Sequence, residues 1–176
     1  MTRDIDLASK LITFKSVTPI DDGAISYLQN LLTNSGFTCI VKEFGEDKPI
    51  KNLYARFGTK SPNLCFAGHT DVVPIGDATA WTVDPFGGTI KDGYLVGRGV
   101  VDMKSAIACF IAAAEQFISN NSEFGSISLL ITGDEEADAI NGTVKMLQAL
   151  PKNELNHCIV GEPTNPKDLG EMIKIG

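Results

Sequence analysis

Short apolar segments that end close to histidine or carboxylate side chains recur along this chain, and they most constrain its fold. Such segments lie at Asn63–Ala67 before His69, at Ser126–Thr132 before Glu135 and Glu136, and at His157–Val160 before Glu162. Strands that are apolar on both faces are typical of a sheet covered by further layers. Helical segments between them favour an α/β protein.

The rest of the chain alternates in the same way. Apolar residues at helical spacing predict helices over about Ile5–Phe14, Ala24–Asn34, Lys104–Ser119 and Thr143–Leu150. Further strands are predicted at Thr38–Glu43, Asn52–Phe57 and Tyr94–Val96, and Gly76–Gly93 is expected to be a long loop. We therefore expect a layered α/β/α catalytic domain with a mixed, mostly parallel sheet.

Charge and hydropathy exclude some classes of partner. The 176 residues include 22 acidic and only 15 basic side chains, for a net charge of −7. Binding to nucleic acid or to an anionic membrane relies on Lys and Arg, so neither partner is expected. The N-terminal residues 1–6 are acidic where a signal peptide is basic, and no apolar run approaches membrane-spanning length. We therefore expect a cytoplasmic protein that acts on a small-molecule substrate.

The polar residues that follow the predicted strands form one set. His69, Glu135, Glu136 and Glu162 come after strands, and Asp102 follows Tyr94–Val96 in the same manner. Ligand sites of open α/β sheets collect at the carboxyl ends of the strands. The pattern therefore predicts that these side chains converge at one edge of the sheet.

One imidazole and several carboxylates are suited to Zn²⁺ or its neighbours among the divalent metals. Asp71, two residues after His69, is placed to hold the imidazole, and a carboxylate such as Asp102 can bridge two metals. Of the adjacent Glu135 and Glu136, one can bind metal while the other acts as general base. Each motif alone also fits a solvated acidic loop or a surface turn, and the repetition at strand ends favours the metal site.

The motifs together resemble the zinc-dependent aminoacylase and carboxypeptidase family of dinuclear metallopeptidases. The matching blocks, in order, are Gly68–Pro74, Gly97–Gly99, Asp102–Lys104, Asp134–Glu136, Asn141–Thr143 and Gly161–Pro163. The resemblance implies an amidohydrolase with two Zn²⁺ ions, for which Co²⁺ is a substitute. It also implies a cis peptide bond between Asp102 and Met103.

Roles for individual residues follow from the same resemblance. It implies that His69 and Glu162 bind one zinc ion, that Asp102 bridges both and that Glu136 belongs to the second. Asp71 and Glu135 would be the catalytic residues: Asp71 orients His69, and Glu135 is the general base.

Two specificities stay open within the family. The blocks favour removal of a succinyl group over removal of an acetyl or other acyl group. From another class, a non-catalytic metal-binding domain stays open.

The end of the chain departs from the family pattern. Residues 170–176 resemble the last strand before an inserted dimerisation domain. The resemblance implies that residues 1–176 are the N-terminal part of the catalytic domain, without the dimerisation (lid) domain and the C-terminal catalytic segment. Relatives would then form homodimers through the missing part, which also supplies a histidine for the second zinc ion. His157, the only other histidine here, is a poor candidate for that ligand, so the chain alone is expected to be inactive.

Overall fold

The computed structural model describes residues 1–168, 170–173 and 175. Its helices are α1 (Arg3–Ile12), α2 (Ala24–Asn34), α3 (Ser105–Asn120) and α4 (Thr143–Ala149), with short turns η1 (Ala78–Ala80) and η2 (Val100–Lys104). Its strands are β1 (Thr38–Phe44), β2 (Ile50–Phe57), β3 (Asn63–His69), β4 (Thr89–Lys91), β5 (Tyr94–Val96), β6 (Ser126–Thr132) and β7 (His157–Val160). The helices and strands predicted before residue 170 are confirmed, with their ends shifted by two residues at most.

Five strands form the central sheet, in the order β1-β2-β6-β3-β7. β3 runs parallel to both β6 and β7, whereas β2 runs antiparallel to β1 and β6. These pairings mean that β2 alone points opposite to the other four strands. The sheet is therefore mixed and mostly parallel, as the sequence predicts, and β6, β3 and β7 end at a common edge.

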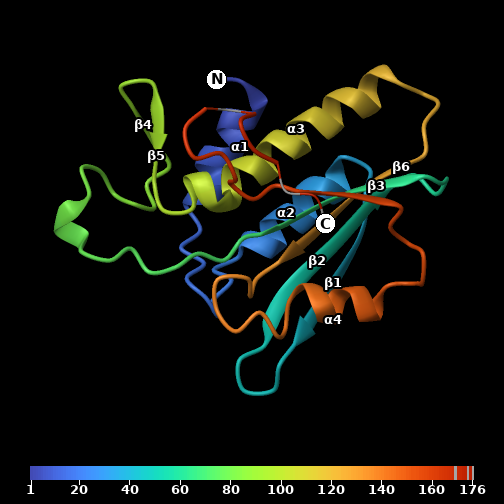
Figure 1. Cartoon of the computed structure of the whole chain (residues 1–176), viewed down its shortest axis with the longest axis horizontal. Helices are drawn as coiled ribbons and strands as arrows, with labels where there is room; N and C mark the ends of the chain where they lie inside the picture. The colour runs from blue at the N-terminus through green and yellow to red at the C-terminus, as the bar shows by residue number, and fades with distance from the viewer. Residues whose placement is uncertain (169, 174, 176) are drawn as a thin grey trace.

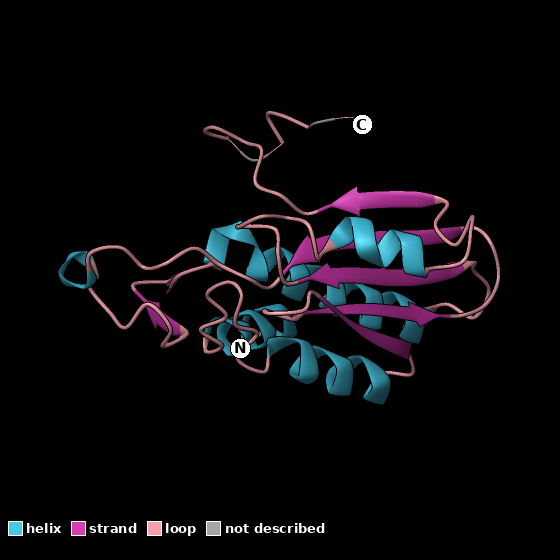
Figure 2. Ribbon diagram, turned by 90° about the horizontal axis from the view of Figure 1, so that it is seen from below, coloured by secondary structure: helices cyan, strands magenta, loops and turns pink. Residues whose placement is uncertain are grey.

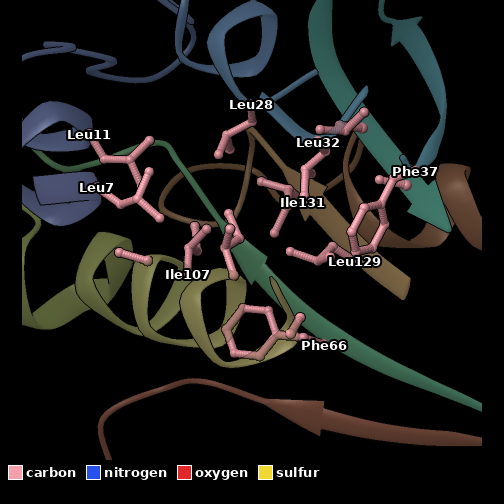
Figure 3. Close-up of a cluster of buried hydrophobic side chains, with 14 of the residues drawn as sticks. Leu7, Leu11, Leu28, Leu32, Phe37, Phe66, Ile107, Leu129 and Ile131 are labelled. Carbon is pink, nitrogen blue, oxygen red and sulfur yellow. The ribbon is translucent and has the colours of Figure 1, made fainter. Parts of the chain in front are cut away.

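Helices cover both faces of this sheet, so the domain has the expected three layers. In Figure 1, α3 lies above the strands and α4 below them. Neighbouring residues of a strand point to opposite faces. Leu129 of β6 packs in the large core beneath α1, α2 and α3, whereas Leu130 packs against Met146 of α4. Figure 3 shows the large core, with labelled side chains from these three helices meeting Leu129 and Ile131 of β6.

A small separate hairpin corrects two predictions. Thr89–Lys91, which the sequence assigned to a loop, forms β4 and pairs with β5 in a two-stranded sheet of its own. β5 was expected in the main sheet, but it has only three residues and pairs with β4 alone. Figure 2 shows this hairpin and η1 to the left of the main sheet. Local sequence identified a strand here, but it carried no information about its partner.

β7 lies at the edge of the sheet and leaves apolar side chains exposed there. Ile159 and Val160 are about half exposed or more, as are Val144 and Leu147 of nearby α4. The strand expected within residues 170–176 is wrong for those that the structure describes, and Lys174 and Gly176 lie outside the described residues. No helix among the described residues is long and apolar enough to span a membrane.

Candidate metal centre

His69 lies at the base of the centre. It is the last residue of β3, and its side chain is 1% exposed. Its Nδ1 atom lies 2.9 Å from the main-chain oxygen of Asp71, which turns the opposite ring nitrogen, Nε2, towards the surface. A ring held in this way has a defined tautomer and can offer Nε2 to a ligand.

Carboxylates from three other segments surround Nε2. The nearest oxygen atoms belong to Asp102 at 3.1 Å, Glu162 at 3.3 Å and Glu135 at 3.5 Å. Glu136 completes a second group with His69 and Asp102. The structure thus brings together all five residues that the sequence placed at this edge.

Asp102 reaches the centre by an unexpected route. The sequence placed it at the carboxyl end of a strand in the main sheet, but β5 belongs to the separate hairpin. Asp102 lies instead in η2, the irregular turn that leads into α3. That expectation was wrong about the element that carries Asp102, although it was right about where the side chain lies. The expected cis peptide bond between Asp102 and Met103 is present.

Asp71 connects two parts of the centre. Its buried carboxylate accepts hydrogen bonds from the main-chain N–H groups of Glu135, at 3.0 and 3.2 Å, and of Glu136, at 2.9 Å. The same carboxylate lies 3.5 Å from Nδ1 of His69. Asp71 therefore fixes the turn that carries both glutamates as well as lying beside the imidazole.

The charges of the centre shift several pKa values. Burial alone would lower the pKa of His69, but hydrogen bonding to Asp71 and the charges of Asp71 and Glu162 raise it to about 9. Burial and the neighbouring charge of Asp102 raise the pKa of both Glu136 and Glu162 above the usual range. Several carboxylates thus repel one another around one imidazole, an arrangement that a divalent cation stabilises.

The donor atoms also suit such a cation in their spacing. They form two groups, one of His69, Glu135 and Glu162 and one of His69, Asp102 and Glu136, with all atoms of a group within 4.8 Å of one another. Zinc bonds of about 2.0–2.2 Å in a tetrahedron place ligand atoms about 3.4 Å apart. The separations of 3.1–3.5 Å from Nε2 match that value. The residues present therefore fit a zinc ion.

Met103 packs against the end of β3 from beneath. Its Sδ atom accepts the main-chain N–H of His69 at 3.4 Å. A Cβ atom on Gly68 would lie 2.5 Å from the Met103 methyl carbon, and one on Gly161 would lie 2.9 Å from it. These two glycines therefore leave the space that the methionine side chain fills.

Three supporting residues received no role from the sequence. Met103 is one, and Asp134 is another: its buried carboxylate accepts the N–H groups of Ile140 and Asn141, which holds the loop after the glutamates. The third is Lys104, whose side chain is fully buried. Their positions in the matching motifs were the only sequence signal, and Met103 and Lys104 in addition depend on contacts with distant segments.

His157 lies far from the centre, as expected. It begins β7 and pairs with Leu64 near the start of β3, whereas His69 ends β3. Five residues of strand at about 3.3 Å each separate the two levels by roughly 16 Å. Among the described residues, His69 is the only histidine at the centre.

Curated proteins match this chain over nearly its whole length. Curated proteins named succinyl-diaminopimelate desuccinylase are 57% identical in Rhodospirillum centenum, over 177 aligned residues, and 54% identical in Pelagibacter ubique, over 178. Each alignment covers 98% of this chain and 46% of the relative. The chain thus spans about half the length of the curated relatives it matches.

Solved structures share the fold. Human carnosine dipeptidase 1 superimposes with a TM-score of 0.77 at 21% identity, covering 89% of this chain and 37% of that protein. An M20 family metallo-carboxypeptidase from Sulfolobus solfataricus gives a TM-score of 0.76 at 22% identity, covering 92% and 37%. The family model described as peptidase family M20/M25/M40 matches residues 65–176, which hold every residue of the candidate centre. With more than half of its length matched, and with its histidine and carboxylates gathered at one edge of the sheet, the chain belongs to peptidase family M20/M25/M40.

Proposed function

We propose that this chain supplies the metal-binding part of a succinyl-diaminopimelate desuccinylase. The reaction is hydrolysis of the amide of N-succinyl-LL-2,6-diaminopimelate to succinate and LL-diaminopimelate, in lysine and diaminopimelate biosynthesis. The observation that carries the proposal is the convergence of three carboxylates on Nε2 of the buried His69, with Glu136 in a second donor group that shares His69. The choice of substrate is supported by the printed names of relatives that are more than 50% identical.

The proposed metals are two Zn²⁺ ions in the complete active site, with Co²⁺ as a substitute. His69 and Glu162 would hold one ion, Asp102 both, and Glu136 the second. Zinc, when bound, polarises an amide carbonyl and lowers the pKa of water. Asp102 lies 3.1 Å from Nε2 of His69 and shares one donor group with Glu136, and this proximity to both residues supports its bridging role.

Glu135 would move the proton. Its side chain is half exposed, and its main chain is held by the buried Asp71 carboxylate, so it can face an approaching substrate without losing its position. As a general base it would take a proton from the attacking water and return it to the leaving amine. Asp71 would contribute by holding both the imidazole and the turn that carries Glu135.

The family resemblance implies a histidine ligand for the second metal, and the described residues do not supply one. His157 lies at the opposite end of the sheet, so the ligand would come from outside these 176 residues. We expect the isolated chain to have little or no turnover for that reason. Assembly as a homodimer, action on a small-molecule substrate, absence of nucleic acid or membrane partners, and a cytoplasmic location stay predictions from the sequence.

Substrate choice can be tested in the natural protein that contains this chain. Initial rates on N-succinyl-LL-2,6-diaminopimelate and on N-acetylornithine would be compared at equal zinc content. A preference of 100-fold or more for the succinyl substrate is the expected result. Faster cleavage of the acetyl substrate would instead favour an acetylornithine deacetylase or a broader aminoacylase of the same family.

Metal stoichiometry separates an enzyme from a non-catalytic metal-binding domain. The natural protein should bind two zinc ions and lose its activity when they are removed by a chelator. The isolated chain should bind one at most. Two zinc ions without hydrolysis of either substrate would support the non-catalytic alternative, although a poised Glu135 would then have no purpose.

A further inference from the structure

Lys104 is a buried cation for which the proposed chemistry has no use. Its side chain is fully buried at the start of α3. Its Nζ atom donates hydrogen bonds to the main-chain oxygen of Phe14, at 2.6 Å, and to Oγ of Ser16, at 2.8 Å. Among the described residues, no carboxylate forms a salt bridge with it. Burial lowers the pKa of this amine to about 8, although the charges of Asp21, Asp22 and Asp71 oppose that shift.

Such a site is costly for a lysine. Removing an ammonium group from water is unfavourable even after relaxation, and an apolar side chain would fill the same volume without that cost. The contacts of the amine are therefore informative, because they show which parts of the structure it connects.

The hydrogen bonds of Lys104 continue to the end of β3. Ser16 Oγ, which accepts from Lys104, donates to the main-chain oxygen of Thr70 at 2.8 Å. The main-chain oxygen of Ser16 accepts the N–H of Val72 at 3.0 Å. Thr70 lies between His69 and Asp71, and Val72 follows Asp71. Through one serine, the amine thus reaches both chain neighbours of the buried Asp71.

The same turn touches β3 at a second point. Met103, directly before Lys104, accepts the N–H of His69 at its Sδ atom. Asp102, one residue earlier, places Oδ1 3.1 Å from Nε2 of His69. The spacing between Asp102 and His69 therefore depends on how firmly the Asp102–Lys104 segment is attached to the end of β3.

We propose that Lys104 is a positioning residue of the metal centre: through Ser16 and Thr70, its ammonium group fixes the Asp102–Lys104 segment against the end of β3 and so sets the spacing between Asp102 and His69. This inference rests on the proposed function in that the spacing matters for metal binding. The hydrogen-bonded path itself is independent of any metal.

Amide hydrogen exchange of the metal-free chain tests the path. Lys104→Met keeps the volume and removes the hydrogen bonds, and Met146→Ala, in the small core beneath α4, serves as a control for lost stability. We expect exchange at His69 and Val72 to be at least tenfold faster in Lys104→Met than in the control, at matched global stability. Exchange that rises equally in β1 and β2 would assign Lys104 to general stability and overturn the proposal.

Co²⁺ binding to the same variants tests the consequence for the metal. Lys104→Met should weaken Co²⁺ affinity at least tenfold and change the visible absorption of bound Co²⁺, whereas Met146→Ala should leave the spectrum unchanged. An unchanged spectrum and affinity in Lys104→Met would overturn the positioning role. If the parent chain binds no Co²⁺, the metal-site proposal fails for this chain, and the exchange measurement still decides the role of Lys104.

Ser16→Ala provides a second route should Lys104→Met not fold. It removes the middle of the path while the amine keeps its bond to Phe14. Faster exchange at Val72 is expected here too. If Lys104→Met does fold, combining it with Ser16→Ala should change Co²⁺ affinity less than additively, because both changes break one path. Fully additive effects would show two independent contributions and contradict the proposal.

Discussion

The base and the rim of the metal centre are built in opposite ways. At the base, the side chains of His69 and Asp71 are 1% and 2% exposed and make several hydrogen bonds. At the rim, the side chains of Asp102 and Glu135 are 46% and 52% exposed, and their carboxylates face the imidazole and one another. The base therefore supports both the fold and the position of the ligand, whereas the rim carries charge that a cation and a substrate can reach. Changes at the two places should have different consequences.

The largest effect is expected on turnover, from removal of the proposed general base at the rim. Glu135→Ala should lower turnover of the natural protein by about 100- to 10,000-fold, the usual contribution of a general base. Zinc content and the melting temperature should stay close to those of the parent. Turnover and metal analysis check this prediction. Glu136→Ala is the matched variant and should lose metal, so loss of zinc from Glu135→Ala would show that the two roles are reversed.

Protonation of His69 should oppose metal binding at the base. A ligand imidazole must be neutral, and the pKa of His69 in the metal-free chain is raised to about 9. Apparent Zn²⁺ affinity should therefore rise about tenfold per pH unit below that value, or about 100-fold from pH 7 to pH 9. Competition titrations with a chelator at several pH values measure it. An affinity that does not change with pH in this range would argue against His69 as a ligand.

A change in Asp71 should affect stability and metal binding together. Asp71→Asn removes the negative charge and replaces one of the two oxygens that accept the N–H groups of Glu135 and Glu136 by an amide donor. We expect a loss of about 2–3 kcal/mol in the free energy of unfolding, because buried hydrogen bonds to a charged acceptor are weakened. Metal affinity should fall about 10- to 100-fold. Denaturant unfolding and zinc titration check both. Asp92→Asn, in the exposed turn between β4 and β5, is the control, and equal effects in both variants would contradict the prediction.

The smallest effect is expected from neutralising one carboxylate of the rim. The pKa of Glu162 is raised by burial and by neighbouring carboxylates, so its ionised form is disfavoured in the folded state. A carboxyl group with a raised pKa reduces stability as the pH rises through that pKa. Glu162→Gln should therefore stabilise the metal-free chain at pH 7 by less than about 1 kcal/mol, because the side chain is partly solvated. A clear loss in thermal melts would show that Glu162 supports the fold.

The sequence predicted that the site residues converge, but it did not predict the contacts that hold them in place. His69, Glu135 and Glu162 follow three adjacent parallel strands, so a general rule for α/β sheets was enough to place them together. Asp102 broke the rule, because the partner of a three-residue strand is set by contacts that its own sequence does not encode. Lys104 is 90 residues from Phe14, which accepts its hydrogen bond, and Asp71 is 64 and 65 residues from the amides that donate to it. No local pattern could have revealed them.

The enclosure of Met103 has a consequence for oxidative damage. Its thioether is fully buried beside Gly68 and Gly161, and its sulfur accepts the N–H of His69. An oxidant therefore reaches this sulfur only when the chain opens, unlike that of the partly exposed Met172. A sulfoxide formed in an opened molecule would add an oxygen atom to a space with no room for it. The reaction would convert a transient opening into a lasting loss of the folded centre, which methionine sulfoxide reductases could reverse only by acting on the open chain.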